Sequence, residues 1–441
     1  MRFNYLLFFI ITYSCFSCKT TTETIPPNQV KIVKDNDGKY GLTVAGKPFV
    51  VKGAGLSYAD GTNYKALKEA GGTAFRTWHT THAKQALDSA AHYGLMVAFG
   101  LEIDKELHGF DYNDEAKVKE QIAHLKGEVD KYKDHPNILC WVVGNELNLL
   151  FNEEGGLKLV NPKTYIALNE VVEYIHEVDP NRPVTTTFAG GEKTHIDLAL
   201  KHCPNLDFIS FQVYGGLGDM PKIVAASGID KPFMVTEFGP MGHWEMPSTK
   251  WGREIEEPSA RKAKGYYTRI QNGIANDPSG KNIGHFAFLW GQKQERTPTW
   301  YGMFHKSGEA TATVDELTKY WTGVYPKNRA PQVDSMKLNG QNAVDNIYLN
   351  AGREYGATVF ASEPDNDPLI YKWTVLKEVD ERSQGGAKEV EPKGINLAGL
   401  SEGDHLLQFR APTKKGDYRL FIYVYDGKGK VGNANIPFFV N

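Results

Sequence analysis

Apolar runs recur through most of the chain, and they constrain the fold more than any other feature of the sequence. Each run is followed by a segment with helical periodicity, such as "AKQALDSAAHYG" or "PKTYIALNEVVEYIHEVDP". Buried strands that alternate with helices predict a parallel sheet, and eight such units predict a (β/α)₈ barrel. A doubly wound open sheet is the alternative, but no Gly-rich dinucleotide fingerprint follows the first run. The runs are Phe49–Ser57, Ala74–Thr80, Leu95–Ile103, Ile138–Leu147, Pro183–Gly190, Phe208–Gly215, Pro232–Gly239 and Gly284–Gln292.

The pattern changes near Arg329. From there on, short alternating runs such as "EYGATVFAS" and "LIYKWTVL" are separated by turn clusters such as "EPDNDP". Short strands at this spacing predict a β-sandwich, and "ASEPDNDPLIYKWTV" resembles immunoglobulin-like or PKD-like modules. We therefore expect a barrel over residues 31–326 and a sandwich over residues 327–441.

The N-terminus has the features of a targeting segment. Arg2 precedes the apolar stretch "NYLLFFIITYSCFSC", which is too short to span a bilayer. Cys15 and Cys18 each follow a serine, and the polar tether "KTTTETIPPNQ" follows Cys18 directly. The arrangement resembles a bacterial lipoprotein signal, which implies a signal peptide over residues 1–17, lipidation of Cys18 and a tether over residues 18–30. It also implies a lipid anchor in the cell envelope; lipidation of Cys15 or a plain secretory signal are the alternatives.

Composition and charge narrow the classes of partner. The chain carries 50 Lys and Arg against 53 Asp and Glu, a formal net charge of −3, which gives no electrostatic basis for binding nucleic acid. The remaining cysteines, Cys140 and Cys203, are too few for a disulfide framework. The sequence shows neither the ligand spacing of a metal site nor a phosphate-binding loop, so we expect no metal and no cofactor.

Several of the apolar runs end in side chains that could take part in binding or catalysis. Because active sites of (β/α)₈ barrels lie at the carboxyl ends of the strands, these side chains are expected to meet at one mouth of the barrel. Two of the runs deliver a glutamate there, Glu146 after the fourth strand and Glu237 in the seventh. The other strand ends supply Arg76, Trp78 and His79, then Asn145, then Gln212 and Tyr214, then Thr236, and finally Trp290 and Gln292.

A pair of facing carboxylates can hydrolyse a glycosidic bond, because one protonates the leaving oxygen while the other attacks or activates water. At a separation of ~5.5 Å and an effective dielectric constant of about 20, their repulsion is about 3 kcal/mol. This corresponds to roughly two pKa units, enough to keep one glutamate protonated near neutral pH while the other stays ionised.

The motifs "GNE" at Glu146 and "TEFG" at Glu237 resemble those of the clan A retaining glycoside hydrolases, nearest to the catalytic barrel of family two. The resemblance implies that Glu146 is the acid/base and Glu237 the nucleophile. It also implies that Asn145 binds the sugar 2-hydroxyl and that Arg76 and Tyr214 hold the nucleophile. Trp290 would form the platform under the sugar whose bond is cleaved.

The sequence thus predicts a retaining β-glycoside hydrolase. The substrate we expect first is a β-glucan, in particular a β-1,3-linked one. A transglycosylase would share the same residues, and a non-catalytic glycan-binding lipoprotein is the alternative from another class. We expect a carbohydrate substrate, a membrane contact through the lipid anchor, and a monomer. Because the composition changes near Arg329, residues 28–328 are expected to retain the whole active site.

The anchor can be tested in a Gram-negative host. The wild-type protein should label with a fatty-acid analogue and sediment with membranes, and Cys18→Ala should release or mislocalise it. Labelling that persists in Cys18→Ala would assign the lipid to Cys15, and an unlabelled wild type would leave only a plain signal peptide.

Overall fold

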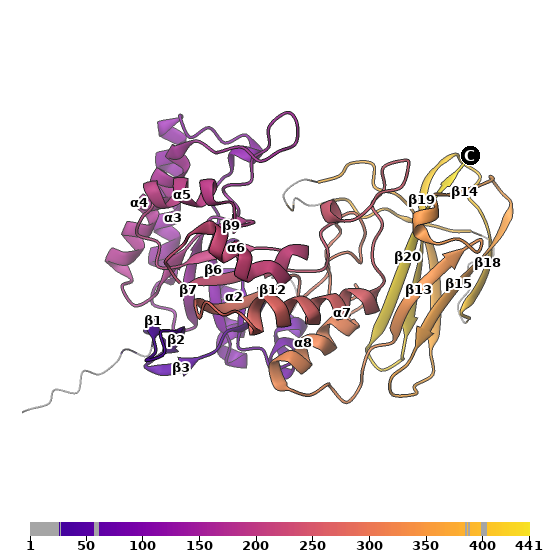
Figure 1. Ribbon diagram of the computed structural model, residues 1–441, viewed down its shortest axis with the longest axis horizontal. Coiled ribbons are helices and arrows are strands. Elements are labelled where there is room, and N and C mark those ends of the chain that lie inside the picture. The colour runs from indigo at the N-terminus through magenta and orange to yellow at the C-terminus, as the bar shows by residue number, and fades with distance from the viewer. Residues whose placement is uncertain (1–25, 27, 57–60, 384–385, 387–388, 398–403) are drawn as a thin grey trace, which may run out of the picture.

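The computed structural model describes residues 26, 28–56, 61–383, 386, 389–397 and 404–441. The predicted signal peptide, Cys18 and most of the tether lie outside the described residues. No helix in the described part of the chain is long and apolar enough to cross a membrane. The barrel and a C-terminal β domain lie side by side, with α7 and α8 at their junction (Figure 1).

The predicted parallel barrel is confirmed. Its nine-stranded sheet has the order β8-β7-β6-β5-β4-β12-β11-β10-β9, and β8 and β9 are two parts of one run, separated only by Thr186. That run pairs with β7 on one side and with β10 on the other, so the described sheet closes on itself as eight strand positions. The strands are β4 (Lys52–Gly55), β5 (Ala74–Arg76), β6 (Met96–Leu101), β7 (Ile138–Val143), β8 (Val184–Thr185), β9 (Thr187–Ala189), β10 (Ile209–Gln212), β11 (Phe233–Phe238) and β12 (Asn282–Ala287).

A helix follows each strand position, as the periodic segments predict. Apolar faces such as Leu168, Val171 and Ile175 of α4 pack against the outer side of the strands, where they form the main core. The helices are α1 (Gly61–Glu69), α2 (Ala83–Tyr93), α3 (Glu115–Tyr132), α4 (Pro162–Val178), α5 (Lys193–His202), α6 (Met220–Ser227), α7 (Ser259–Ile270) and α8 (Ala312–Thr322).

A second core fills the inside of the barrel. Cys140 and Phe208 lie in it, and Leu42 and Val30 of a small N-terminal sheet pack onto it. This antiparallel sheet consists of β1 (Val30–Lys34), β2 (Tyr40–Val44) and β3 (Lys47–Phe49). Since Val30 N–H donates to Asn181 O, just before β8, the sheet covers the amino ends of the strands. The opposite mouth is left for the functional side chains.

The C-terminal domain consists of two sheets around a shared apolar core. One sheet has the order β13-β15-β18 and the other β14-β20-β19-β16-β17. An immunoglobulin-like identity for this domain stays a prediction. The strands are β13 (Gln332–Leu338), β14 (Ile347–Leu349), β15 (Glu354–Ser362), β16 (Ile370–Lys377), β17 (Gly394–Ile395), β18 (Leu406–Arg410), β19 (Gly416–Tyr425) and β20 (Val431–Val440).

Buried polar contacts join this domain to the barrel. Arg419 of β19 is 2% exposed and donates to Glu378 Oε1 (2.8 Å), to Asn435 Oδ1 (2.8 Å) and to the backbone oxygen of Glu254 (2.7 Å). Asn435 in turn donates to Glu256 Oε2 (2.6 Å), and Glu256 pairs with Lys262 of α7. Buried charges that are fully paired fix the orientation of the groups around them, so the C-terminal domain is docked on the barrel rather than tethered to it.

Removal of one partner of a buried ion pair should therefore lower the free energy of unfolding much more than removal of one partner of an exposed ion pair. Arg419→Ala leaves Glu378 buried and unpaired, and the free energy of unfolding should fall by about 3–5 kcal/mol. Arg410 is the matched control, since its pair with Glu354 is 63% and 68% exposed, and Arg410→Ala should cost about 0–1 kcal/mol. Urea denaturation of both variants checks this; equal losses would contradict the docked interface.

Candidate active site

A cleft of about 1420 Å³ lies over the carboxyl ends of the barrel strands. Glu146, Tyr214 and Glu237 line it, together with the loops that follow their strands. Ser383 and Gly386 of the C-terminal domain also line it, and Lys293 Nζ of the barrel donates to Gly386 O (2.9 Å). The expectation that residues 28–328 carry the whole site therefore does not hold for the lining of the cleft, to which two residues from beyond them contribute.

A β-bulge in β11 turns Glu237 into the barrel mouth. Phe211 of β10 pairs with Val235, but the next residue, Gln212, pairs with Glu237, so Thr236 is the extra residue. Val235 and Phe238 both pack on the helix side in the main core. Under strict alternation Glu237 would also point toward the helices, and the bulge re-aims it, as bulges beside active sites commonly do.

Four donors converge on the Glu237 carboxylate. Oε1 accepts from Arg76 Nη1 (2.7 Å), Trp78 Nε1 (2.7 Å) and Gln212 Nε2 (3.1 Å). Oε2 accepts from the Tyr214 hydroxyl (3.1 Å). Arg76 is fully buried, and its charge compensates that of Glu237 where water is largely excluded. The arrangement orients the carboxylate and leaves Oε2 less engaged than Oε1.

The turn after β7 brings Asn145 and Glu146 to the same mouth. Gly144 (φ 77°) and Glu146 (φ 51°) both lie in the left-handed region, which costs a residue other than glycine roughly 1–2 kcal/mol. The Glu146 N–H donates to Thr187 Oγ1 (2.8 Å), which holds the turn against the neighbouring strand. A non-glycine residue in this conformation at the end of a buried strand is typical of a functional site.

The Asn145 amide is oriented by its own hydrogen bonds. Its Oδ1 accepts from Arg76 Nη2 (2.6 Å), Gln212 Nε2 (2.6 Å) and Thr187 Oγ1 (3.3 Å). Three donors on one atom identify it as the oxygen. The NH₂ group of Asn145, which lines the cleft, is thus left to donate to a ligand.

Glu146 differs electrostatically from Glu237. Burial, followed by the nearby negative charge of Glu237, raises the pKa of Glu146 to about 7, against a smaller opposing effect of Lys105 and Arg76. Glu146 is therefore protonated over much of the range below neutral pH. Burial also raises the pKa of Tyr214, followed in effect by the charge of Glu237, so its hydroxyl stays a hydrogen-bond donor. An acid and a carboxylate thus share one cleft.

Trp290 does not lie where the sequence places it. Its side chain is fully buried in the main core, where it packs against Trp321 of α8 (centroids 5.8 Å apart) and Phe304 (5.3 Å). Regular pairing of β12 ends at Ala287, so alternation along the strand no longer decides which way the later side chains point. Phe288 lines the cleft instead and packs edge-on against Trp78 (5.7 Å).

The structure brings together Arg76, Asn145, Glu146, Tyr214 and Glu237, all of which the sequence indicates. The strand ends also predict Trp78 and Gln212 at the mouth, and the structure gives each of them a hydrogen bond to Glu237. The residues that the structure adds are Thr187 and Phe288. Thr187 carries no signal in the sequence, because its role depends on a contact with the neighbouring strand. In the described residues no group of three His, Cys or carboxylate side chains could hold a metal ion.

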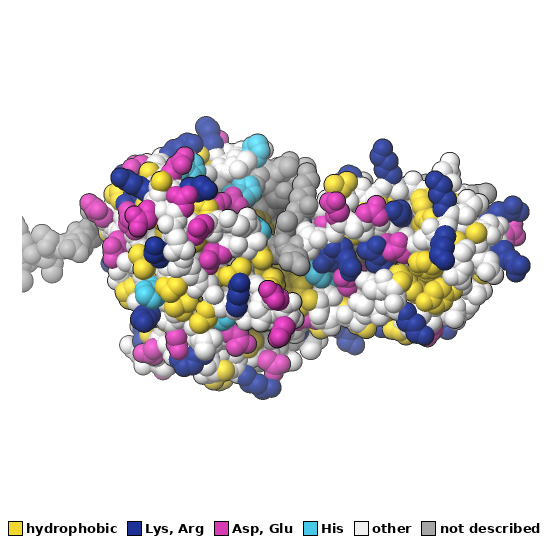
Figure 2. Space-filling model, turned by 90° about the horizontal axis from the view of Figure 1, so that it is seen from above, with side chains coloured by type: hydrophobic (Ala, Val, Ile, Leu, Met, Phe, Trp, Pro, Cys, Tyr) yellow, Lys and Arg dark blue, Asp and Glu magenta, His cyan; other side chains and the backbone are white. Residues whose placement is uncertain are grey.

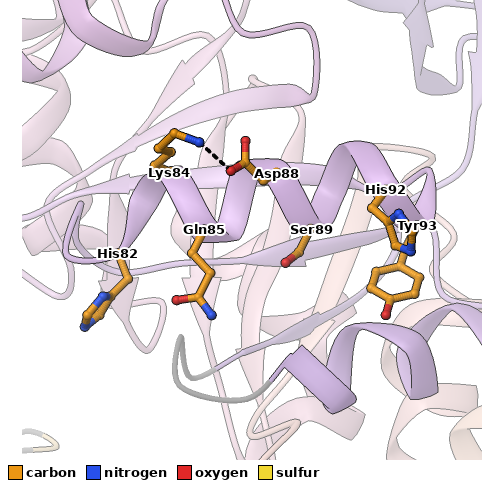
Figure 3. A pocket seen from close by; sticks show the side chains of 7 residues that line it. All are labelled: His82, Lys84, Gln85, Asp88, Ser89, His92 and Tyr93. Atoms are coloured by element: carbon orange, nitrogen blue, oxygen red, sulfur yellow. Dashed lines mark hydrogen bonds and ion pairs between the residues drawn. The ribbon is translucent and has the colours of Figure 1, made fainter.

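A second, shallower hollow lies along α2 (Figure 3). Its side chains come mainly from one face of that helix, and Lys84 pairs there with Asp88 (2.7 Å). It holds a single carboxylate among the residues that line it, so it does not offer the paired acids of the main cleft.

Comparison with known proteins shows which barrels this one resembles. Residues 51–243 match the family described as "Glycosyl hydrolases family 2, TIM barrel domain". Over these residues the barrel is similar to the TIM barrel of glycoside hydrolases. The match ends just beyond Glu237 and includes Glu146, Asn145, Arg76 and Tyr214. This match supports the prediction of a glycoside hydrolase barrel from the sequence.

The chain is also similar to β-glucuronidases. It is 25% identical to the human enzyme over 157 residues, which are 34% of this chain and 21% of the relative. It is 26% identical to the enzyme of Chlorocebus aethiops over 128 residues, which are 28% of this chain and 17% of the relative. The crystal structure of Bacteroides uniformis β-glucuronidase superposes with a TM-score of 0.51 at 14% identity, over 93% of this chain and 48% of that one. The Bifidobacterium dentium β-glucuronidase gives 0.51 at 20% identity, over 68% and 50%.

These similarities show the fold of the chain but not its substrate. At 14% and 20% identity the two structures show a shared fold. This chain spans about half the length of each solved structure and about a fifth of the curated relatives. The substrate of this chain therefore has to be inferred from its own cleft.

The raised pKa of Glu146 can be measured directly by carbon-13 NMR of labelled glutamate carboxyl groups. The Glu146 resonance should titrate near pH 7. In Glu237→Gln the negative charge that helps to raise this pKa is gone, so the midpoint should move to lower pH. Glu153, an exposed carboxylate that also lines the cleft, is the control, and Glu153→Gln should leave the midpoint in place. A wild-type midpoint near that of a free glutamate would contradict the account.

Proposed function

We propose that this protein is a retaining β-glycoside hydrolase that works by double displacement. The observation that carries the proposal is the unequal pair at the barrel mouth. Glu237 is held by four donors, one of them a buried arginine, whereas the pKa of Glu146 is raised to about 7. One group is thus prepared to attack and the other to give a proton, which is what retention requires.

In the first step, the Glu146 carboxylic acid protonates the glycosidic oxygen and Glu237 Oε2 attacks the anomeric carbon. The bond to the leaving group breaks, and a covalent glycosyl-enzyme forms with inversion at that carbon. Because glycosylation removes the charge of Glu237, the pKa of Glu146 falls and its carboxylate becomes a base. In the second step Glu146 takes a proton from water as the water oxygen attacks the same carbon. The bond from that carbon to Glu237 breaks, which frees the carboxylate, and the second inversion restores the β configuration.

Other residues of the cleft would position the sugar. The NH₂ group of Asn145 is oriented by three hydrogen bonds to its oxygen and would donate to the sugar 2-hydroxyl. Phe288 takes the place predicted for Trp290 and would cover an apolar ring face. Tyr214 and Trp78 would keep the Glu237 carboxylate aligned during attack.

A neutral substrate fits the charges of the cleft. Among the described lining residues, eight carry a carboxylate and three carry a Lys or Arg cation. Two of those cations are already paired, Lys293 with Glu295 (2.6 Å) and Arg296 with Glu389 (2.6 Å). A uronic acid would meet like charge, which disfavours binding. We therefore propose a neutral β-glucan, with β-1,3-linked glucan first, over the glucuronides that the relatives' names indicate.

The roles of the two glutamates give distinct expected results. Glu237→Ala should abolish turnover of aryl β-glycosides, and azide should restore part of it by attacking in the vacated space. Glu146→Ala should lose roughly 10²–10⁴-fold on substrates with poor leaving groups and much less on activated aryl glycosides, which need little protonation. Glu153→Gln is the matched control. Near-wild-type rates in both alanine variants would overturn the assignment.

A panel of neutral and acidic β-glycosides tests the proposed substrate class. Reducing-end release from β-1,3- and β-1,4-glucans should exceed turnover of an aryl β-glucuronide under the same conditions. The opposite ranking would overturn the neutral-substrate proposal while leaving the mechanism in place. Products longer than the substrate at high sugar concentration would indicate transglycosylation, and binding of glucan without turnover would indicate a glycan-binding protein.

We also propose that the enzyme is anchored to the cell envelope through Cys18. The support is the serine-cysteine pair after a short apolar segment, followed by a polar tether. An anchored hydrolase would act on glycans that reach the envelope, which fits a polymeric substrate.

A further inference from the structure

One tryptophan at the cleft is unlike the others. Trp244 follows β11 in the short helix His243–Glu245 and is 60% exposed. The remaining seven tryptophans, all described, are buried or partly buried. Trp244 also lines the cleft that contains Glu146 and Glu237. A large apolar ring left in water beside a functional cleft indicates a binding role.

The Trp244 ring is held in place before any ligand binds. Its ring centroid lies 5.3 Å from that of Tyr214, edge-on at 80°, and 4.9 Å from the His243 ring at 85°. The helix is fixed in turn by Glu245, whose Oε2 accepts from Gly242 N–H (2.6 Å) and Gly215 N–H (2.9 Å). A ring that is already ordered loses little conformational freedom on binding.

One face of the ring is covered by the protein. A Cβ at position 242 would lie 2.5 Å from Trp244 Cε2 and Cζ2, so the indole rests directly on the Gly242 backbone. The backbone of Gly242 has φ −61°, a conformation open to any residue. The glycine is thus needed for the close approach of the ring and not for its own conformation. Despite this contact, Trp244 remains 60% exposed.

The ring is also close to the reacting atoms. Tyr214, which it contacts, donates to the Glu237 carboxylate. The cleft of about 1420 Å³ exceeds the ~300–1,000 Å³ typical of small-ligand pockets, so it has room for more than one sugar ring. A flat apolar surface beside the nucleophile matches the apolar face of a neighbouring β-linked pyranose.

We propose that Trp244 is the platform for a second sugar ring, next to the one that reacts at Glu237, and that it makes the enzyme selective for glucan chains over single glycosides. This inference rests on the proposed function. The substrate class it names is a neutral oligosaccharide of at least two β-linked residues.

The test is calorimetric and uses the nucleophile variant Glu237→Gln as background, so that binding is measured without turnover. The probes are a β-1,3-linked glucotetraose, a β-1,4-linked glucotetraose and glucose. Trp244→Ala should weaken binding of the preferred tetraose by roughly tenfold to a hundredfold, the range for loss of an aromatic anchor. Its affinity for glucose should change far less, so the ratio of the two affinities falls.

Two further variants separate a platform from a structural role. Gly242→Ala keeps the indole but displaces it, and it should lower the same ratio. Phe360→Ala removes an exposed aromatic ring (50% exposed) from β15, outside the cleft, and should leave the ratio unchanged. An equal loss of affinity for tetraose and glucose in Trp244→Ala, or no loss for either, would overturn the proposal, as would a background protein that binds neither tetraose.

Failure of the proposed function gives a different result. Turnover of a β-glucosyl fluoride, whose leaving group is too small to contact a platform, reports on the reacting centre around Glu237 without the contribution of Trp244. Absence of this turnover, with tetraose binding still dependent on Trp244, would overturn hydrolysis and keep the platform.

Discussion

The ion pair between Arg76 and Glu237 determines the arrangement of the whole site. Arg76 is fully buried at the end of β5, and its guanidinium bridges Glu237 of β11 and Asn145 after β7. A buried arginine without such partners would be strongly destabilising, so these strand ends have to meet at this mouth. The pair thereby positions Glu237, the proposed nucleophile, and the Asn145 amide beside it. It also positions Glu146, the proposed acid, because Glu146 follows Asn145 directly in the chain.

The same pair separates the two glutamates chemically. Arg76 and three neutral donors engage Glu237, whereas Glu146 lies partly buried near the charge of Glu237 and has a raised pKa. Two identical side chains thus acquire opposite roles from their surroundings. In the proposed mechanism the reaction reverses this relation, since loss of charge on Glu237 would let Glu146 act as a base.

Much of this architecture was predictable from the sequence, and the errors have physical reasons. Strand positions followed from apolar runs, and Glu146 and Glu237 followed from their places at the strand ends. The bulge at Thr236, which turns Glu237 inward, leaves no mark in the alternation of side chains. The prediction of Trp290 as a platform was wrong because the regular strand ends at Ala287. Beyond that residue, the alternation of side chains no longer predicts which way a side chain points.

Contacts between distant segments lie outside what a single sequence pattern can predict. The composition break near Arg329 lies just before β13, and residues beyond that break still line the cleft. Ser383 and Gly386 reach the cleft, and Arg296 of the barrel is held by Glu389. The surface drawn in Figure 2 carries acidic and basic side chains interspersed over both bodies, in keeping with a net charge near zero.

The central claim is that Glu237 forms a covalent bond to the sugar while Glu146 supplies and then removes a proton. Proton NMR of the first-formed product, recorded before mutarotation, tests it most directly. The account predicts that a β-linked substrate yields the β-anomer first. Initial release of the α-anomer would mean a single displacement by water, and it would contradict the role of Glu237 as nucleophile.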